Sequence, residues 1–187
     1  MQINLSWDLF VIVFFAVIIA YSFIIGRNQT LKIIISSYIA ILAADGIGNL
    51  IQQFFIGENA IVEPISVTNT ESSLIIIKIV IFVFTIVLMT TRGRFDISMG
   101  RTGSGMLNFG LALIYGILSA GLITSTILLY ASGTSLMQEG LVMNDAMINI
   151  YRESQLVRLM INNYNVWFAL PAITFVVSSL IGGESEA

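Results

Sequence analysis

Four long apolar runs constrain the fold of this chain more than any motif does. They cover residues 9–25, 33–56, 74–91 and 106–130. At 1.5 Å per residue, such runs are long enough to cross about 30 Å of hydrocarbon as helices. A backbone inside a bilayer must satisfy its own hydrogen bonds, and no run shows the alternating pattern of a strand. The sequence therefore predicts an all-α fold, with four transmembrane helices in a single integral membrane domain over residues 1–187.

The composition agrees with a membrane protein and excludes several kinds of chemistry. Hydrophobic residues make up 57% of the chain, charged residues only 10%, and the mean hydropathy is +0.93. The net charge of -3 and the absence of a basic tract give no reason to expect a nucleic-acid partner. The chain has neither cysteine nor histidine, which excludes disulfides, zinc sites and histidine-dependent triads within one chain. We expect no metal and no cofactor, and we read the first apolar run as a retained span because no basic residue precedes it.

Two motifs that resemble enzyme signatures do not fit on inspection. Intramembrane aspartyl proteases need two membrane-embedded aspartates, one of them in the order GxGD, whereas this chain has a single DGIG at 45–48. The GRTGSG at 100–105 lacks the lysine of a phosphate-binding loop and follows no strand. These absences predict a protein without catalytic residues.

The breaks between the runs predict the orientation of the chain. Short cytoplasmic loops retain lysine and arginine. The first and third breaks hold five basic residues, and the second break holds Glu58, Glu63 and Glu71 with no basic residue. The five are Arg27, Lys32, Arg92, Arg94 and Arg101. We therefore expect the first and third breaks on the cytoplasmic side of the membrane and the N-terminus outside.

The chain changes character after the fourth run. Apolar residues recur at spacings of three and four between residues 141 and 164, which predicts an amphipathic helix at the outer face. Arg152, Ser154 and Arg158 belong to this segment. The apolar tail segment 166–181 is short for a crossing and contains Pro171. Two alternatives remain for it, a fifth span or a segment that stays at the outer side.

Asp45 is the residue that most needs an explanation. It lies near the middle of the second run, where an ionised carboxylate costs at least about 2.5 kcal/mol on insertion scales and usually has a partner. Asn49 and Gln52 follow at i+4 and i+7, and extend a polar stripe along one helix face. Lys78 is the basic residue inside another span, and its depth allows its side chain to approach Asp45. We propose a pair between Asp45 and Lys78. In the alternative, Asp45 is protonated, or Gly46 and Gly48 break the helix and Asp45 faces water, while Lys78 extends outward.

Small residues repeat every four positions in the fourth run. Asn108, Ala112, Gly116 and Ala120 form this stripe, which lets two helix backbones approach closely. The stripe predicts either packing within one chain or a seam between copies in a homo-oligomer.

Several short stretches resemble the colicin V production protein family, CvpA. They are WD at 7–8, GRNQTLK at 26–32, LALIYGILSAG at 111–121, ESQLVRLM at 153–160 and LP at 170–171. The resemblance implies a small bacterial inner-membrane protein with four spans and a C-terminal helix. It also implies a role in toxin production or export and in envelope homeostasis, without an established reaction.

Two functions follow as hypotheses. In the first, the protein is a membrane scaffold or accessory factor for toxin or peptide export, with export or envelope proteins as partners. In the second, it is a small oligomeric channel or permease with a polar interior around Asp45. In both, the lipid bilayer surrounds the chain.

Overall fold

The computed structural model describes residues 7–56, 70–95, 97, 105–134 and 143–182, and these residues form helices and no strand. The helices are α1 (Trp7–Ile25), α2 (Arg27–Ile51), the short π-helix η1 (Gln52–Ile56), α3 (Thr70–Arg92), α4 (Gly105–Ala131), α5 (Asp145–Glu153), α6 (Gln155–Asn162) and α7 (Tyr164–Gly182). Within this part of the chain, four helices are long and apolar enough to cross a membrane. The predicted all-α, multi-pass membrane fold is confirmed.

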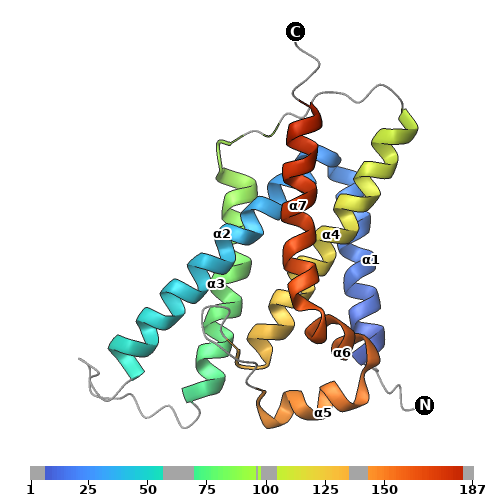
Figure 1. The fold of residues 1–187 in the computed structure, drawn as a ribbon. Helices are drawn as coiled ribbons and strands as arrows, with labels where there is room; N and C mark the ends of the chain where they lie inside the picture. Colours follow the sequence, from blue (N-terminus) through green and yellow to red (C-terminus); the bar gives the residue numbers. More distant parts are fainter. Residues whose placement is uncertain (1–6, 57–69, 96, 98–104, 135–142, 183–187) are drawn as a thin grey trace.

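The long helices stand side by side as a bundle, with α5 and α6 folded across one end (Figure 1). We call the end that carries α5 and α6 the elbow end, and the other the turn end, after the turn between α1 and α2. α4 lies at the centre and contacts α1, α2, α3, α6 and α7, while α2 packs mainly on α3. The outward faces of α1 and α3 are apolar and exposed, as expected for helices surrounded by lipid.

The first break is much shorter than the sequence suggested. α1 ends at Ile25 and α2 begins at Arg27, so that Gly26 alone makes the turn, with a φ of 82°. The hydroxyl of Thr30 donates to the carbonyls of Gly26 and Ser22 and closes this turn. The prediction of a basic loop over residues 26–32 is therefore wrong, because one glycine in the left-handed region is enough to reverse the chain.

Lys32 is consequently a buried helical residue. Its ammonium donates to the carbonyl of Gly93 at 2.7 Å, just after the last residue of α3, and lies 5.1 Å from the centre of the Phe95 ring. A cation at a helix C-terminus satisfies an orphan carbonyl and opposes the helix dipole. Lys32 thus joins α2 to α3 at the turn end.

α2 continues through both of its glycines without a break. It is helical from Arg27 to Ile51, and its end widens into the π-helix at Gln52–Ile56. The alternative in which Gly46 and Gly48 interrupt the helix is therefore wrong. Glycine lowers helix propensity by about 1 kcal/mol, which packing against α3 can offset.

The small-residue stripe of α4 is used inside the chain. A Cβ on Gly116 would lie 3.2 Å from the Cβ of Ser22 in α1, and one on Gly121 would lie 1.9 Å from the Trp167 ring in α7. Ala120 is fully buried and Ala112 half-buried. Of the two alternatives for this stripe, the structure favours packing within one chain.

The predicted single amphipathic helix over residues 141–164 is two helices. Ser154 leaves the helical conformation, with φ -108° and ψ 122°, and serves as the C-cap of α5 and the N-cap of α6. Its hydroxyl accepts a hydrogen bond from the Val157 amide at 3.1 Å. The prediction of one continuous helix failed because the Ser154 side chain accepts the hydrogen bond of the Val157 amide. In a continuous helix, that amide would bond to a carbonyl of the preceding turn.

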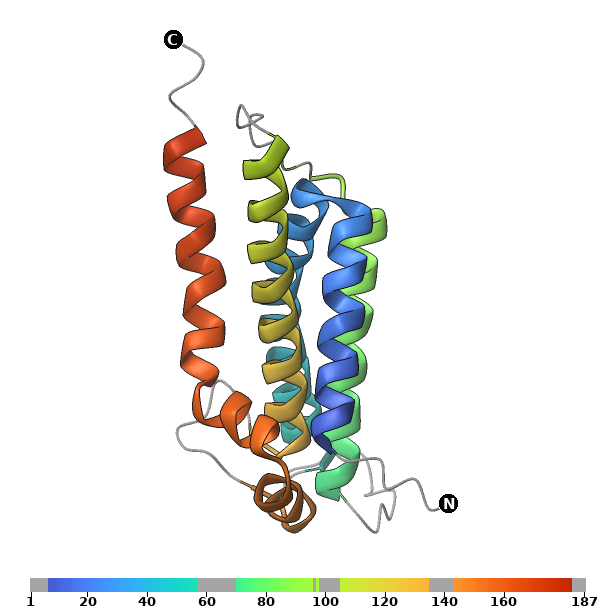
Figure 2. The same cartoon turned by 90° about the vertical axis from the view of Figure 1, so that its right-hand side faces the viewer.

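α7 runs alongside α4 in the opposite direction, from the elbow end to the turn end (Figure 2). Its 19 residues are about 28 Å long at 1.5 Å per residue, although its described apolar part, Tyr164–Ser179, is shorter than that of the other four. The hydroxyls of Tyr115 and Ser178 share a hydrogen bond, and Tyr38 donates to the Phe168 carbonyl next to the kink-prone Pro171. The apolar tail segment is therefore a helix packed along the bundle, and both alternatives for it, a fifth span or a segment at the outer side, stay predictions.

Candidate functional site

An ion pair joins α2 and α3 inside the bundle. The Lys78 ammonium lies 3.3 Å from Asp45 Oδ1 and donates a second hydrogen bond to Asn49 Oδ1 at 3.2 Å. Asp45 has no exposed surface, and Lys78 is 8% exposed. The predicted pair is thus present, and the lysine compensates the charge that a carboxylate would otherwise carry unpaired at this depth.

Gly48 makes room for the lysine stem. A Cβ on Gly48 would lie 2.6 Å from Lys78 Cε and 2.7 Å from Lys78 Cγ, closer than side chains pack, whereas a Cβ on Gly46 would meet nothing within 4 Å. Asp45, Gly48 and Asn49 lie at i, i+3 and i+4, on one face of α2. The DGIGN stretch therefore forms a cradle for Lys78, with an acceptor on each side of a glycine gap.

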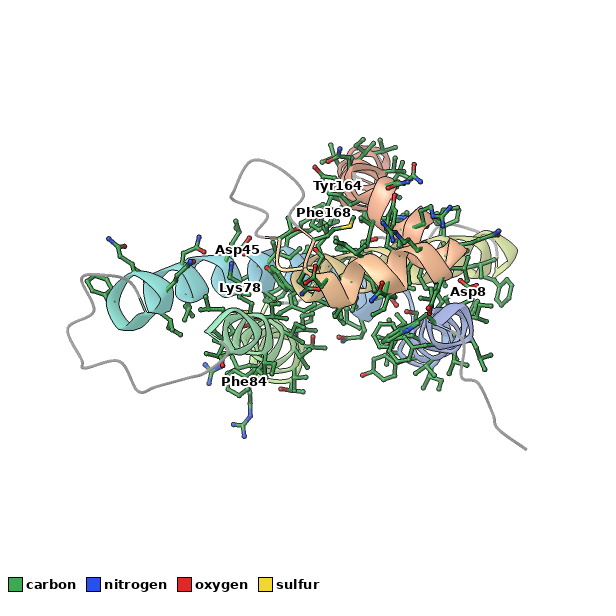
Figure 3. All side chains as sticks on the ribbon, turned by 90° about the horizontal axis from the view of Figure 1, so that it is seen from below. Asp8, Asp45, Lys78, Phe84, Tyr164 and Phe168 are labelled. Atoms are coloured by element: carbon green, nitrogen blue, oxygen red, sulfur yellow. The ribbon has the colours of Figure 1, made fainter. Side chains whose placement is uncertain are left out.

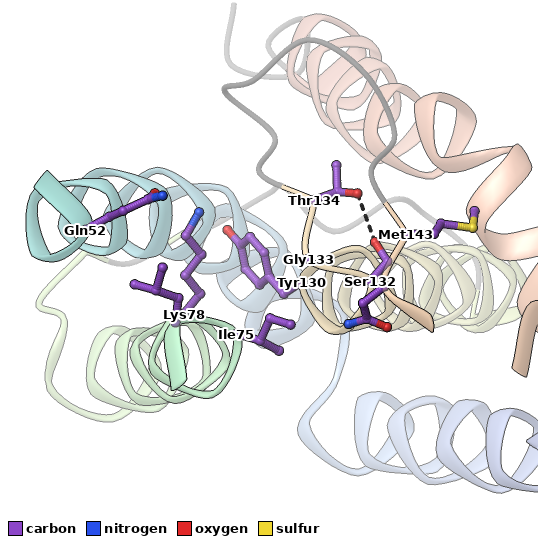
Figure 4. Close-up of a pocket in the computed structure, with 10 residues that line it drawn as sticks. Gln52, Ile75, Lys78, Tyr130, Ser132, Gly133, Thr134 and Met143 are labelled. Carbon is purple, nitrogen blue, oxygen red and sulfur yellow. Dashed lines mark hydrogen bonds between the residues drawn. The ribbon is translucent and has the colours of Figure 1, made fainter. Parts of the chain in front are cut away.

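A cavity of about 250 Å³ lies beside this cradle at the elbow end (Figure 4). It lies between η1, α3, the end of α4 and the residues just before α5. Its polar lining comes from Gln52, Lys78, Tyr130, Ser132, Thr134 and Asn144, and its apolar lining mainly from Leu74, Ile75 and Met143. In Figure 4 the Lys78 ammonium lies between Gln52 and the Tyr130 hydroxyl. The lysine thus touches Asp45 on one side and the cavity on the other.

On the turn-end side of the pair, the interior holds an apolar cluster together with buried hydroxyl side chains such as Ser36 and Ser37. The Tyr130 hydroxyl donates to the Ile41 carbonyl at 3.2 Å. Ile41, Phe82 and Leu122 pack in the same buried cluster as Tyr130, and Phe82 and Leu122 have no exposed surface. Of this cluster, Tyr130 alone belongs to the described lining of the cavity.

A second polar contact fastens the two short helices to the start of α1. Asp8 Oδ1 accepts hydrogen bonds from the Ser154 hydroxyl at 2.6 Å and from the Leu156 amide at 3.0 Å. Figure 3 shows Asp8 beside α5 and α6, well apart from Asp45 and Lys78. A carboxylate that meets free amides at a helix N-terminus is favourable for the helix dipole as well as for hydrogen bonding.

Arg158 holds the angle between α5 and α6. Its guanidinium donates to the carbonyls of Tyr151 at 3.3 Å and Arg152 at 3.0 Å, and stacks over the Tyr151 ring at 5.6 Å. The Tyr151 hydroxyl in turn donates to Asn162 Oδ1 at 2.7 Å. The pair α5–α6, which we call the elbow, is therefore bound both to α1 and to itself.

The structure brings some of the predicted residues together and separates others. Gln52 lines the cavity beside Lys78, and the side chain of Asn108 and all of Arg101 lie outside the described residues. Arg152 is exposed on α5, whereas Ser154 is buried at the break. Arg27, Arg92 and Arg94 lie at the turn end, at or next to the ends of α2 and α3.

Sequence reasoning missed the roles of Gly48 and Asp8. The role of Gly48 could have been inferred from the sequence. This glycine follows the intramembrane Asp45 by one helical turn, and a neighbouring span carries a lysine whose side chain needs room beside that aspartate. Asp8 and Ser154 are separated by 146 positions, and no spacing rule connects them.

Comparisons with known proteins identify no relative. No family model, no curated protein and no solved structure matches this chain.

Proposed function

We propose that this protein is a non-enzymatic membrane scaffold that presents the elbow to partner proteins at the outer face of a bacterial inner membrane. The observation that carries the proposal is the fastening of the elbow by Asp8 and Arg158. Its apolar residues, such as Met147, Val157 and Ile161, are buried against the bundle. This leaves a mainly polar outer surface, with Leu159 exposed on α6, held in place by these hydrogen bonds. A preorganised surface is a property that a docking platform needs.

The resemblance to CvpA supplies the process in this proposal. The partners would then be components of toxin or peptide export and of envelope homeostasis. The N-terminus and the elbow would face outward, and the basic residues of the turn end would face the cytoplasm.

A crosslinking experiment tests the scaffold. A photo-reactive amino acid replaces the exposed Asn149 on α5, and a control chain carries it at the exposed, apolar position Ile76 on α3. In cells we expect a discrete adduct from position 149 and none from position 76. We further expect the adduct to be lost when Asp8→Ala releases the elbow. An adduct that is unchanged by Asp8→Ala, or none from position 149, would contradict the proposal.

The channel is the alternative function, and the cavity beside Lys78 is the observation in its favour. The apolar cluster around Phe82 argues against a path through a single chain. Ion and small-solute flux is measured in liposomes with the native chain, Asp45→Asn and Lys78→Met at matched incorporation. The scaffold predicts no flux from any of the three. Flux from the native chain that collapses with Asp45→Asn would favour the channel.

A further inference from the structure

The cavity beside the cradle has the donors and the shape of a binding site. Its volume of about 250 Å³ is close to the lower end of the range for small-ligand pockets. Its lining comes from η1, α3, the end of α4 and residues outside the helices at 132–134 and 143–144.

Two side chains at this cavity carry N–H donors that have no acceptor among the described residues. The Lys78 ammonium has three N–H donors, and its hydrogen bonds to Asp45 and Asn49 occupy two of them. Gln52 is exposed, and its side-chain amide makes no hydrogen bond to the described residues. A ligand that fits here must therefore offer acceptors at the Lys78 and Gln52 side of the cavity.

The ammonium at the cavity wall favours a hydrogen-bond acceptor over a cation, although its charge is offset by Asp45. Lys78 is the one charged residue in the described lining, while Asp45 lies behind it with no exposed surface. The hydroxyls of Ser132 and Thr134 bond to each other at 2.9 Å on the facing wall. An oxyanion meets the ammonium directly, whereas a cation would meet it before it could reach the aspartate.

The depth of the cavity indicates which oxyanion. It lies at the elbow end of the bundle, and the polar headgroup layer extends about 5 Å or more beyond the hydrocarbon. Lysine is a common phosphate ligand, and a lysine near the end of a span usually directs its ammonium toward this layer. Leu74, Ile75 and Met143 add apolar wall beside the donors, suited to the carbon atoms attached to a phosphodiester.

We propose that this cavity binds a phosphate group, with Lys78 and Gln52 as its ligands. The phosphate comes either from a phospholipid headgroup or from a small soluble phosphate. Both sources offer the same oxygens to the same two donors, and the test distinguishes them.

The two lysines of the chain make the test selective. Lys78 lies at the cavity, and Lys32 is buried at the opposite end of the bundle, so Lys32 is an internal control. Protein labelled with ¹³C at lysine Cε and purified in a maltoside detergent gives two signals, which Lys32→Met assigns. It is titrated with inorganic phosphate, with a short-chain phosphatidylglycerol, and with chloride at matched ionic strength.

We expect a saturable shift of the Lys78 signal and none of the Lys32 signal. Gln52→Ala should weaken binding about tenfold, as expected for one lost hydrogen bond to a charged group, while Gln53→Ala, next to the lining but outside it, should leave the affinity unchanged. Saturation with inorganic phosphate supports a soluble ligand, and saturation with the lipid alone supports a headgroup. No shift, an equal shift with chloride, or equal shifts of both lysines would overturn the proposal.

Discussion

At the scale of single residues, the cradle of Lys78 explains an unusual stretch of α2. A buried charge pair contributes little net stability, but loss of one member leaves the other uncompensated and costs about 3–5 kcal/mol. The position of the lysine therefore matters more than its charge alone. Gly48 allows that position because the Lys78 side chain passes over α2 at Gly48. A side chain at residue 48 would occupy the same space.

Gly48→Ala should destabilise the protein by about 1–3 kcal/mol, the usual cost of overpacking, because the new methyl group displaces Lys78 from Asp45. Gly46→Ala is the matched control. A Cβ there meets nothing within 4 Å, and alanine is a better helix former, so this variant should be as stable as the native protein or more stable. Thermal unfolding in detergent measures both. Equal stability of the two variants would contradict the cradle.

At the scale of helices, two contacts determine how the C-terminal part joins the bundle. One is the fastening of the elbow by Asp8, and the other is the close approach of α4 and α7 at Gly121. Each contact joins segments that lie far apart in the sequence. Each can therefore be broken without changing the helices that it joins.

Asp8→Ala should release the elbow while the bundle stays folded, since the Ser154 hydroxyl and the Leu156 amide lose their acceptor. Hydrogen exchange of the amides at 155–157 should become faster, whereas exchange in α4 should not change. Glu153→Ala, which removes an exposed acid from the same region, is the control. Unchanged exchange at 155–157 would show that other contacts hold the elbow.

Gly121→Ala should separate α7 from α4, because its Cβ would lie 1.9 Å from the Trp167 ring. We expect a loss of about 1–3 kcal/mol and a shift in tryptophan fluorescence as the ring moves. The double variant Gly121→Ala with Trp167→Leu should recover part of the lost stability, because leucine is smaller than tryptophan and leaves room for the new methyl group. Gly110→Ala is the control, since a Cβ there has nothing within 4 Å. A native-like Gly121→Ala would be evidence against this contact.

At the scale of the whole molecule, the two ends of the bundle differ in what they present. The turn end carries Arg27, Arg92 and Arg94 and the clamp made by Lys32, while the elbow end carries the cavity and the polar faces of α5 and α6. This asymmetry is the basis for the proposed orientation, because basic residues near span ends stay on the cytoplasmic side.

Single cysteines test this orientation, since the chain has none of its own. A membrane-impermeant maleimide applied to intact spheroplasts should label Arg152→Cys on α5. It should label Arg94→Cys only after the membrane is permeabilised. The reverse pattern would invert the proposed topology.

The sequence by itself determined the class of this fold and the need for a partner for Asp45. A bilayer forces each spanning segment to satisfy its backbone locally, so the four long helices and their approximate bounds follow from the apolar runs. It also makes an unpaired charge costly, so a buried aspartate predicts a nearby cation. Both arguments depend on local composition and depth, which can be read along the chain.

Only the tertiary structure decided which faces meet. The Gly48 gap, the fastening of Ser154 to Asp8 and the contact of Gly121 with Trp167 depend on how each helix is rotated and shifted against its neighbours. A shift of one helical turn is about 5.4 Å and would break every one of these contacts while leaving the hydropathy pattern unchanged. The break at Ser154 and the one-residue turn at Gly26 were missed for a related reason, since each depends on side-chain and carbonyl partners that the pattern of apolar residues does not specify.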